Sequence, residues 1–130
     1  MGVIHKFNGT NAAPSWENVD TSVYESSDVK GATRRILIGW NEGARHFAMR
    51  YFEIPPGGRS AYDKHAHDHG VYILKGTARL QLENNTYDVA PGDVVYIAPN
   101  ETHQFENTGG TSFGFLCVVP ARPPGEKEPS

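Results

Sequence analysis

The chain has 130 residues, which is enough for one domain of ordinary size. Hydrophobic residues make up 38% and charged residues 21%, a balance that excludes disorder driven by high charge. The net charge of -3 argues against a nucleic-acid surface, and no apolar run approaches the roughly 18 residues that cross a membrane. The single cysteine, Cys117, cannot form an internal disulfide, so we expect a soluble, cytoplasmic protein without nucleic-acid or membrane partners.

The first 33 residues differ from the rest of the chain. They are polar, lack steady hydrophobic periodicity and contain the turn-like stretch FNGTNAAPSW. We therefore expect residues 1–33 to form an N-terminal arm with at most one or two short strands.

From residue 34 the sequence consists of short apolar runs. Each run is rich in Val, Ile, Tyr or Phe and is bounded by turn sequences such as PPGG, PGD and NTGG. Eight runs at this spacing predict an all-β domain, a sandwich or closed barrel, over residues 34–120. The runs are RRILIGW, RHFAMRYFEI, HGVYILKG, ARLQLEN, NTYDVA, DVVYIAP, HQFEN and SFGFLCVVP. Residues 121–130 are rich in proline and polar residues, which predicts a flexible polar tail.

Histidines gather in one segment of the chain. Three of the six alternate in DKHAHDHG, at His65, His67 and His69, and His103 follows in PNETHQFEN. Alternating residues of a strand point to one face, and imidazole is the commonest protein ligand of transition metals near neutral pH. The pattern predicts a metal site.

The chain must turn inside this segment. On one straight strand His65 and His69 would stand roughly 13 Å apart, too far to share an ion with metal–nitrogen distances near 2 Å. A turn over residues 66–68 therefore ends one extended segment at His65 and begins the next strand at His69. Asp63 then shares the inward face with His65, and we expect His67 to be exposed at the apex of the turn, near the metal but not necessarily on it.

These segments resemble the two sequence motifs of the cupin superfamily. PPGG supplies the glycine turn of the first motif, and HGVYILKG resembles its second half, with Gly76 as the closing glycine. PGDVVYIAPNETHQFEN resembles the second motif, from Gly92 to Asn107. The resemblance covers about residues 34–120 and implies a double-stranded β-helix, or jelly-roll, barrel. The sequence is especially similar to small single-domain cupins that carry a histidine in place of the motif's glutamate.

The resemblance also implies a set of metal ligands. Counting back from Gly76, the glutamate position falls on His69 and the H-x-H pair falls on Asp63 and His65, while His103 is the ligand of the second motif. Asp63 thus stands where a histidine is expected. Either Asp63 binds the metal, or His67 reaches in and Asp63 accepts a hydrogen bond from a histidine N–H; the face shared with His65 favours Asp63.

Three imidazoles and one carboxylate suit one divalent transition metal per chain, namely Fe, Mn, Ni, Zn or Cu. Four ligands on an ion that accepts six leave positions for a substrate, water or oxygen, whereas a structural zinc is closed by four tight ligands. We therefore expect a metal-dependent enzyme that acts on a small polar or carboxylate-type molecule by oxygenase, lyase or isomerase chemistry. The alternative is a non-catalytic, metal-dependent module that binds or senses a small ligand.

Two further expectations concern Cys117 and assembly. Cys117 is too far along the chain to be assigned to the metal site from sequence, and we expect it to be a small buried hydrophobe. A β-sandwich presents strand edges that must be covered, and the arm before Arg34 is long enough to cross onto a neighbour. We therefore expect a homodimer.

Overall fold

The fold was analysed in a computed structural model, which describes residues 1–24 and 29–123. These residues form nine strands and one short 3-10 helix, η1. The elements are β1 (Ser22–Val23), β2 (Thr33–Ile38), η1 (Trp40–Glu42), β3 (Ala48–Ile54), β4 (His69–Lys75), β5 (Ala78–Leu82), β6 (Asn85–Val89), β7 (Val94–Ile97), β8 (His103–Glu106) and β9 (Phe113–Val119). Each of the eight expected runs contains one strand, and the all-β class is confirmed. Of the expected tail over residues 121–130, positions 124–130 lie outside the described residues.

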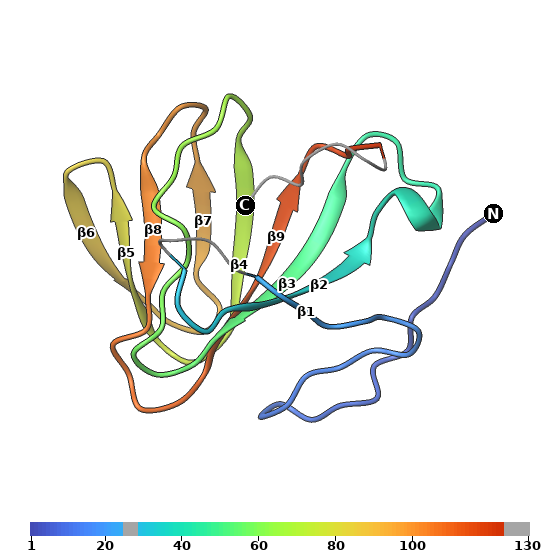
Figure 1. Cartoon of the computed structure of the whole chain (residues 1–130), viewed down its shortest axis with the longest axis horizontal. Coiled ribbons are helices and arrows are strands. Elements are labelled where there is room, and N and C mark those ends of the chain that lie inside the picture. Colours follow the sequence, from blue (N-terminus) through green and yellow to red (C-terminus); the bar gives the residue numbers. More distant parts are fainter. Residues whose placement is uncertain (25–28, 124–130) are drawn as a thin grey trace.

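Two antiparallel sheets form a jelly-roll barrel (Figure 1). The larger sheet has the strand order β1-β2-β3-β9-β4-β7, and the smaller has the order β6-β5-β8. The segment before β4 extends the smaller sheet, since isolated bridges join Arg59 to Glu106 and Asp63 to His103. This pairing places the histidine-rich segment against β8, which carries the fourth histidine.

The core lies between the two sheets and follows from the period of the strands. Along β4 the side chains of His69, Val71 and Ile73 are buried, whereas the residues between them are exposed. Aromatic rings fill the centre, where Phe115 stacks on Phe52 and on Phe105 with ring centroids 5.3 and 4.5 Å apart. The alternation that builds this core also turns His69 into the interior.

Asn107 ties the end of β3 to the loop between β8 and β9. Its side-chain amide donates hydrogen bonds to the carbonyls of Ile54, at 2.9 Å, and Thr111, at 2.8 Å, and its Oδ1 accepts one from the Gly109 N–H at 2.9 Å. The residue is buried, so these bonds satisfy polar groups that water does not reach. The last residue of the second motif is therefore a structural cross-link.

The N-terminal arm packs on its own barrel. Phe7 and Trp16 form a bridge, and the Trp16 ring lies 5.4 Å from the ring of Tyr51 on β3. The Lys75 ammonium donates a hydrogen bond to the carbonyl of Ala12. The arm therefore covers part of the outer face of the larger sheet in the same chain.

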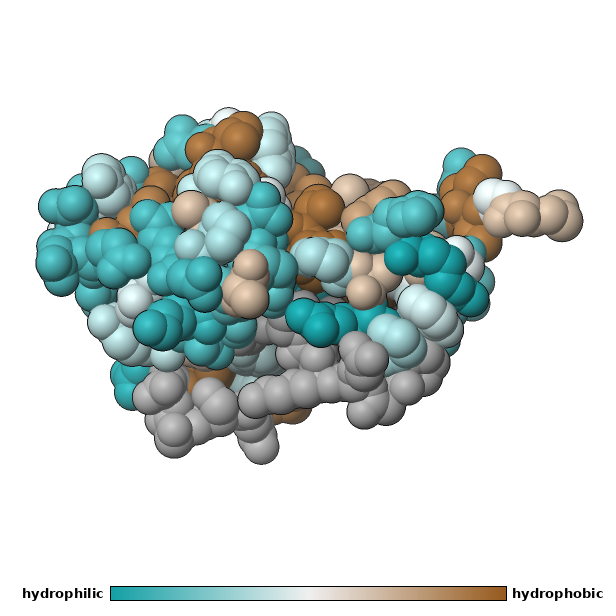
Figure 2. Space-filling model, turned by 90° about the horizontal axis from the view of Figure 1, so that it is seen from above, coloured by the Kyte–Doolittle hydropathy of each residue, from teal (hydrophilic) through white to brown (hydrophobic). Residues whose placement is uncertain are grey.

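The first residues of the arm project from this body. Met1, Val3 and Ile4 are apolar and exposed, and Figure 2 shows the N-terminal end extending beyond the rest of the molecule. The described part of the chain contains no helix that is both long and apolar enough to cross a membrane.

Candidate metal centre

The histidine-rich segment is held by backbone contacts to the β7–β8 turn. The chain bends at residues 66 and 67, and β4 begins at His69, as expected. Asp63 exchanges two backbone hydrogen bonds with His103, of 3.1 and 2.9 Å, and the Asn100 N–H donates to the His65 carbonyl at 2.6 Å. Asn100 adopts a φ of 62°, the left-handed conformation that asparagine enters readily. The turn thus fixes His65 next to His103.

Three imidazoles meet where strands β4 and β8 begin. His65, His69 and His103 each offer a nitrogen, and these atoms all lie within 4.8 Å of one another. The ring planes are inclined to one another by 40° for His65 and His69, 58° for His65 and His103, and 62° for His69 and His103. Two nitrogens on one ion lie at most about 4.2 Å apart, twice the metal–nitrogen distance. The three nitrogens are therefore close enough for one ion to be shared after the rings turn and move together.

The hydrogen bonds of these rings indicate which nitrogens face the ion. His103 Nδ1 lies 2.9 Å from the Glu101 carbonyl, to which it donates, so Nε2 keeps its lone pair. His69 Nδ1 lies 3.3 Å from Cys117 Sγ, and its Nε2 is buried without a hydrogen-bond partner among the residues that the structure describes. A buried polar atom without a partner is rare. An unpartnered Nε2 in a group of imidazoles is what a site for a transition metal requires.

The surroundings of His69 keep it neutral. Burial lowers the pKa of His69 from 6.5 to about 3, and the charges of His103 and Arg50 act in the same direction. A neutral imidazole has one nitrogen lone pair, which is what a metal requires of it. Burial, followed by the charges of His65 and Arg122, also lowers the pKa of His67.

This shift predicts acid sensitivity of the metal-free protein. Between pH 6.5 and about 3 the unfolded chain binds a proton at His69 that the folded chain does not. The free energy of unfolding should therefore fall as the pH falls through this range, by up to about 1.4 kcal/mol per pH unit. Urea unfolding at pH 7 and pH 5 should show a smaller difference for His69→Gln than for the wild type. Equal differences would contradict the prediction.

Asp63 and His67 flank the three imidazoles in different ways. Asp63 Oδ2 lies 3.7 Å from His65 Nε2, and 43% of the Asp63 side chain is exposed. The expectation that His67 is exposed was wrong: it is half-buried, and its ring stacks on His65 with centroids 4.9 Å apart and planes only 9° apart. The ring also lies close to His69, with centroids 4.9 Å apart.

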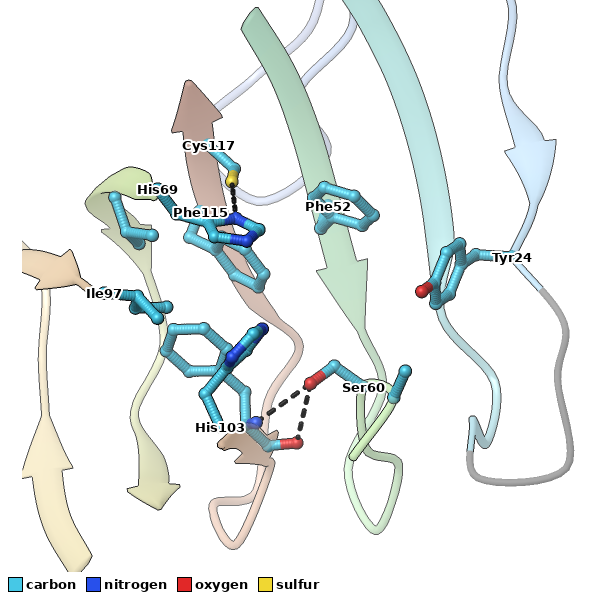
Figure 3. Close-up of a pocket in the computed structure, with 11 residues that line it drawn as sticks. Tyr24, Phe52, Ser60, His69, Ile97, His103, Phe115 and Cys117 are labelled. Atoms are coloured by element: carbon cyan, nitrogen blue, oxygen red, sulfur yellow. Dashed lines mark hydrogen bonds between the residues drawn. The ribbon is translucent and has the colours of Figure 1, made fainter. Parts of the chain in front are cut away.

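A small cavity lies beside the imidazoles (Figure 3). Its volume is about 30 Å³, and apolar side chains such as Phe52, Ile97 and Phe115 form much of its wall. The polar lining residues are Tyr24, Ser60, His69, His103 and Cys117. Figure 3 shows Tyr24 across the cavity from His69 and Ile97. Nothing in the sequence of the arm marks Tyr24 as a cavity residue, and the position of Cys117 along the chain does not assign it to the site.

Comparisons with known proteins agree with this architecture. The family profile Cupin_2, described as a cupin domain, matches residues 50–119. A 1-methylthio-D-xylulose 5-phosphate methylsulfurylase from Rhodospirillum rubrum is 38% identical over 109 residues, which cover 82% of this chain and 69% of that protein.

Solved structures show the same barrel. A cupin 2 conserved barrel domain protein from Rhodopseudomonas palustris matches with a TM-score of 0.80 and 31% identity, over 96% of this chain and 86% of the other. The polyketide cyclase RemF from Streptomyces resistomycificus matches with a TM-score of 0.76 and 31% identity, over 82% and 77% of the two chains. The family profile matches more than half of the length of this chain, and the solved cupin structures have the same barrel. The chain therefore belongs to the cupin family.

Proposed function

We propose that the protein is a metal-dependent enzyme that acts on a small carbonyl-containing molecule. The observation that carries the proposal is the convergence of three imidazoles, one with a buried and unpartnered Nε2, beside an apolar cavity. When bound there, a divalent ion of Fe, Mn, Ni, Zn or Cu supplies Lewis acidity that polarises a carbonyl or carboxylate oxygen.

The chain itself positions the substrate and excludes water. The cavity of about 30 Å³ accepts only one or two water-sized groups, so a substrate inserts a small end and leaves its bulk outside. Phe52 and Phe115 shield that end from solvent, which strengthens electrostatic interactions inside. The Tyr24 side chain lines the same cavity and is the group we assign to orient the inserted end by a hydrogen bond.

The relatives support the substrate class. One is named for a sugar phosphate of the ketose type and the other for a polyketide. Both kinds of molecule carry carbonyl oxygen atoms beside exchangeable C–H groups. We infer that the shared chemistry is activation of a carbonyl and that the oxygenase, lyase or isomerase outcome depends on the substrate.

Metal analysis combined with a proton-exchange screen tests the proposal. The purified protein should contain a divalent transition metal, and in D₂O the loaded protein should exchange or convert at least one member of a panel of ketose phosphates and β-keto acids. NMR follows both events. The chelator-stripped protein should be inactive and should recover on reloading. Metal-loaded protein that binds a panel member without exchange or turnover would instead identify a non-catalytic binding module.

We propose Asp63, rather than His67, as the fourth ligand. A ring nitrogen's lone pair lies in the ring plane, so one ion must lie near the planes of all its imidazole ligands. The planes of His65 and His67 are stacked and only 9° apart, and they do not meet near the rings. The Asp63 carboxylate lies 3.7 Å from His65 Nε2, so it is near one of the three proposed imidazole ligands and supplies a charged oxygen ligand.

Two substitutions separate these alternatives. Asp63→Ala should weaken metal binding by at least about 10-fold, since even the loss of a residue that only supports a ligand has that effect. His67→Ala should change it far less. Chelator competition at one pH measures both, with Asp68→Ala as the control for the loss of one nearby negative charge. The reverse order would identify His67 as the ligand.

We also propose a homodimer that resides in the cytoplasm. The projecting apolar residues Met1, Val3 and Ile4 are exposed in the single chain, and contact with a second copy would bury them. The buried free thiol of Cys117 suits a reducing compartment. Light scattering at micromolar concentration should give twice the chain mass, and deletion of residues 1–4 should shift the protein towards monomer. A monomer mass for the intact chain would contradict this assembly.

A further inference from the structure

Two nitrogen atoms from different strands converge on the sulfur of Cys117. Arg50 Nη2 lies 3.4 Å from Sγ, and His69 Nδ1 lies 3.3 Å from it. Figure 3 shows the contact between Cys117 and the His69 ring. All three residues are buried, and Arg50 is fully so.

Strand pairing fixes this arrangement. Cys117 on β9 pairs with Arg50 on β3 and with Val71 on β4, in the middle of the larger sheet. His69 lies two residues before Val71 on the same face of β4. The sulfur therefore lies between a guanidinium on one side and an imidazole on the other.

A guanidinium only donates hydrogen bonds, so the sulfur accepts in its contact with Arg50. In its contact with His69 two arrangements exist. If the thiol donated to Nδ1, the His69 proton would lie on Nε2, and this buried N–H would face the other imidazoles. His69 Nε2 makes no hydrogen bond within the described part of the chain, so it leaves both arrangements open. The contacts of the sulfur favour the second arrangement, with Nδ1–H donating to it, because a thiol S–H is a weak donor and the sulfur already accepts from Arg50.

We propose that Cys117, held by Arg50, is a positioning residue that fixes His69 as the Nδ1–H tautomer and aims its Nε2 lone pair at the metal position. The tautomer stands on the contacts of this chain alone, and its role towards a metal rests on the proposed function. The arrangement of strands is common to cupin barrels. The sulfur acceptor beside His69, in contrast, depends on the cysteine and the arginine at two paired positions of this sequence.

The ring nitrogens of His69 provide a direct test in the metal-free protein. Long-range ¹H–¹⁵N correlation spectra distinguish a protonated ring nitrogen from one with a lone pair. The wild type should show Nδ1 protonated and Nε2 unprotonated at pH 7. Cys117→Ala removes the acceptor and should give a mixture of tautomers, whereas Cys117→Ser keeps an acceptor and should stay closer to the wild type. A wild-type spectrum with the proton on Nε2 would overturn the proposal.

Metal affinity provides the second readout. Cys117→Ala should weaken Zn²⁺ binding about 10- to 100-fold in chelator competition, the usual cost of losing a partner behind a ligand. Val119→Ala is the matched control, because Val119 is buried on the same strand and face. Its affinity should stay near that of the wild type. An equal loss of affinity in both variants would show that Cys117 acts only through packing and would overturn its positioning role. An unchanged affinity in Cys117→Ala would overturn it as well.

Failure of the wild type to bind Zn²⁺ would reject the proposed function, while the tautomer result would stand separately.

Discussion

Replacing His103 with alanine is expected to abolish stoichiometric metal binding. The His103 side chain is buried, its Nδ1 is committed to the Glu101 carbonyl, and its Nε2 is the group left for the ion. Without it two of the three converging imidazoles remain. The loss should exceed the 10- to 100-fold cost of removing a group that only supports a ligand, so the ion should not survive gel filtration.

Elemental analysis of the purified variant measures this effect. His46→Ala is the matched control, because His46 is exposed and lies outside the imidazole cluster, and it should retain the wild-type metal content. Far-ultraviolet circular dichroism checks that the His103 variant keeps its strands. Full metal retention in a folded His103→Ala protein would refute the ligand assignment.

The second large effect is expected at Gly76, the turn between β4 and β5. Its φ is +71°, and a Cβ there would lie 2.3 Å from the Ser112 carbonyl oxygen and 3.0 Å from the Phe113 Cα. These are backbone atoms and cannot rotate away. A left-handed conformation costs a residue with a Cβ roughly 1–2 kcal/mol, and overpacking adds roughly 1–3 kcal/mol. Gly76→Ala should therefore lower the free energy of unfolding by about 3 kcal/mol.

Gly92→Ala separates the two contributions. Gly92 has a φ of +93°, but a Cβ there would meet no atom within 4 Å. Its substitution should cost only the conformational part, about 1–2 kcal/mol. Urea unfolding of both metal-free variants measures the difference. Equal losses at the two glycines would show that the turn at Gly76 shifts to accommodate the methyl group.

The sequence predicted the strands because each apolar run ends at a turn that the local residues determine. The jelly-roll architecture came only through the family resemblance, since hydrophobic runs do not specify their partners, and the order of strands was not predicted. His65, His69 and His103 were named as ligands from spacing and motif, and the structure brings them together. Whether they bind a metal, with Asp63 or His67, stays a prediction.

The missed features all depend on pairing across long stretches of chain. Cys117 contacts His69, 48 residues away, because β9 lies beside β4. A lone cysteine in an apolar strand carries no local sign of such a contact. The partial burial of His67 was missed because an apical position in a turn is usually exposed, whereas here its ring stacks on that of His65.

The wall of the cavity comes from two parts of the chain, the barrel strands and the segment that contains Tyr24. The imidazoles stand on or beside the central strands, but Tyr24 belongs to a segment that joins the barrel through the two-residue strand β1. The Tyr24 ring packs edge-on against Phe52, with ring centroids 5.6 Å apart. A substitution at Tyr24 therefore reshapes the space opposite the imidazoles and leaves every histidine of the cluster in place. The residue that limits what enters the cavity is thus separate in the sequence from the residues proposed to hold the ion.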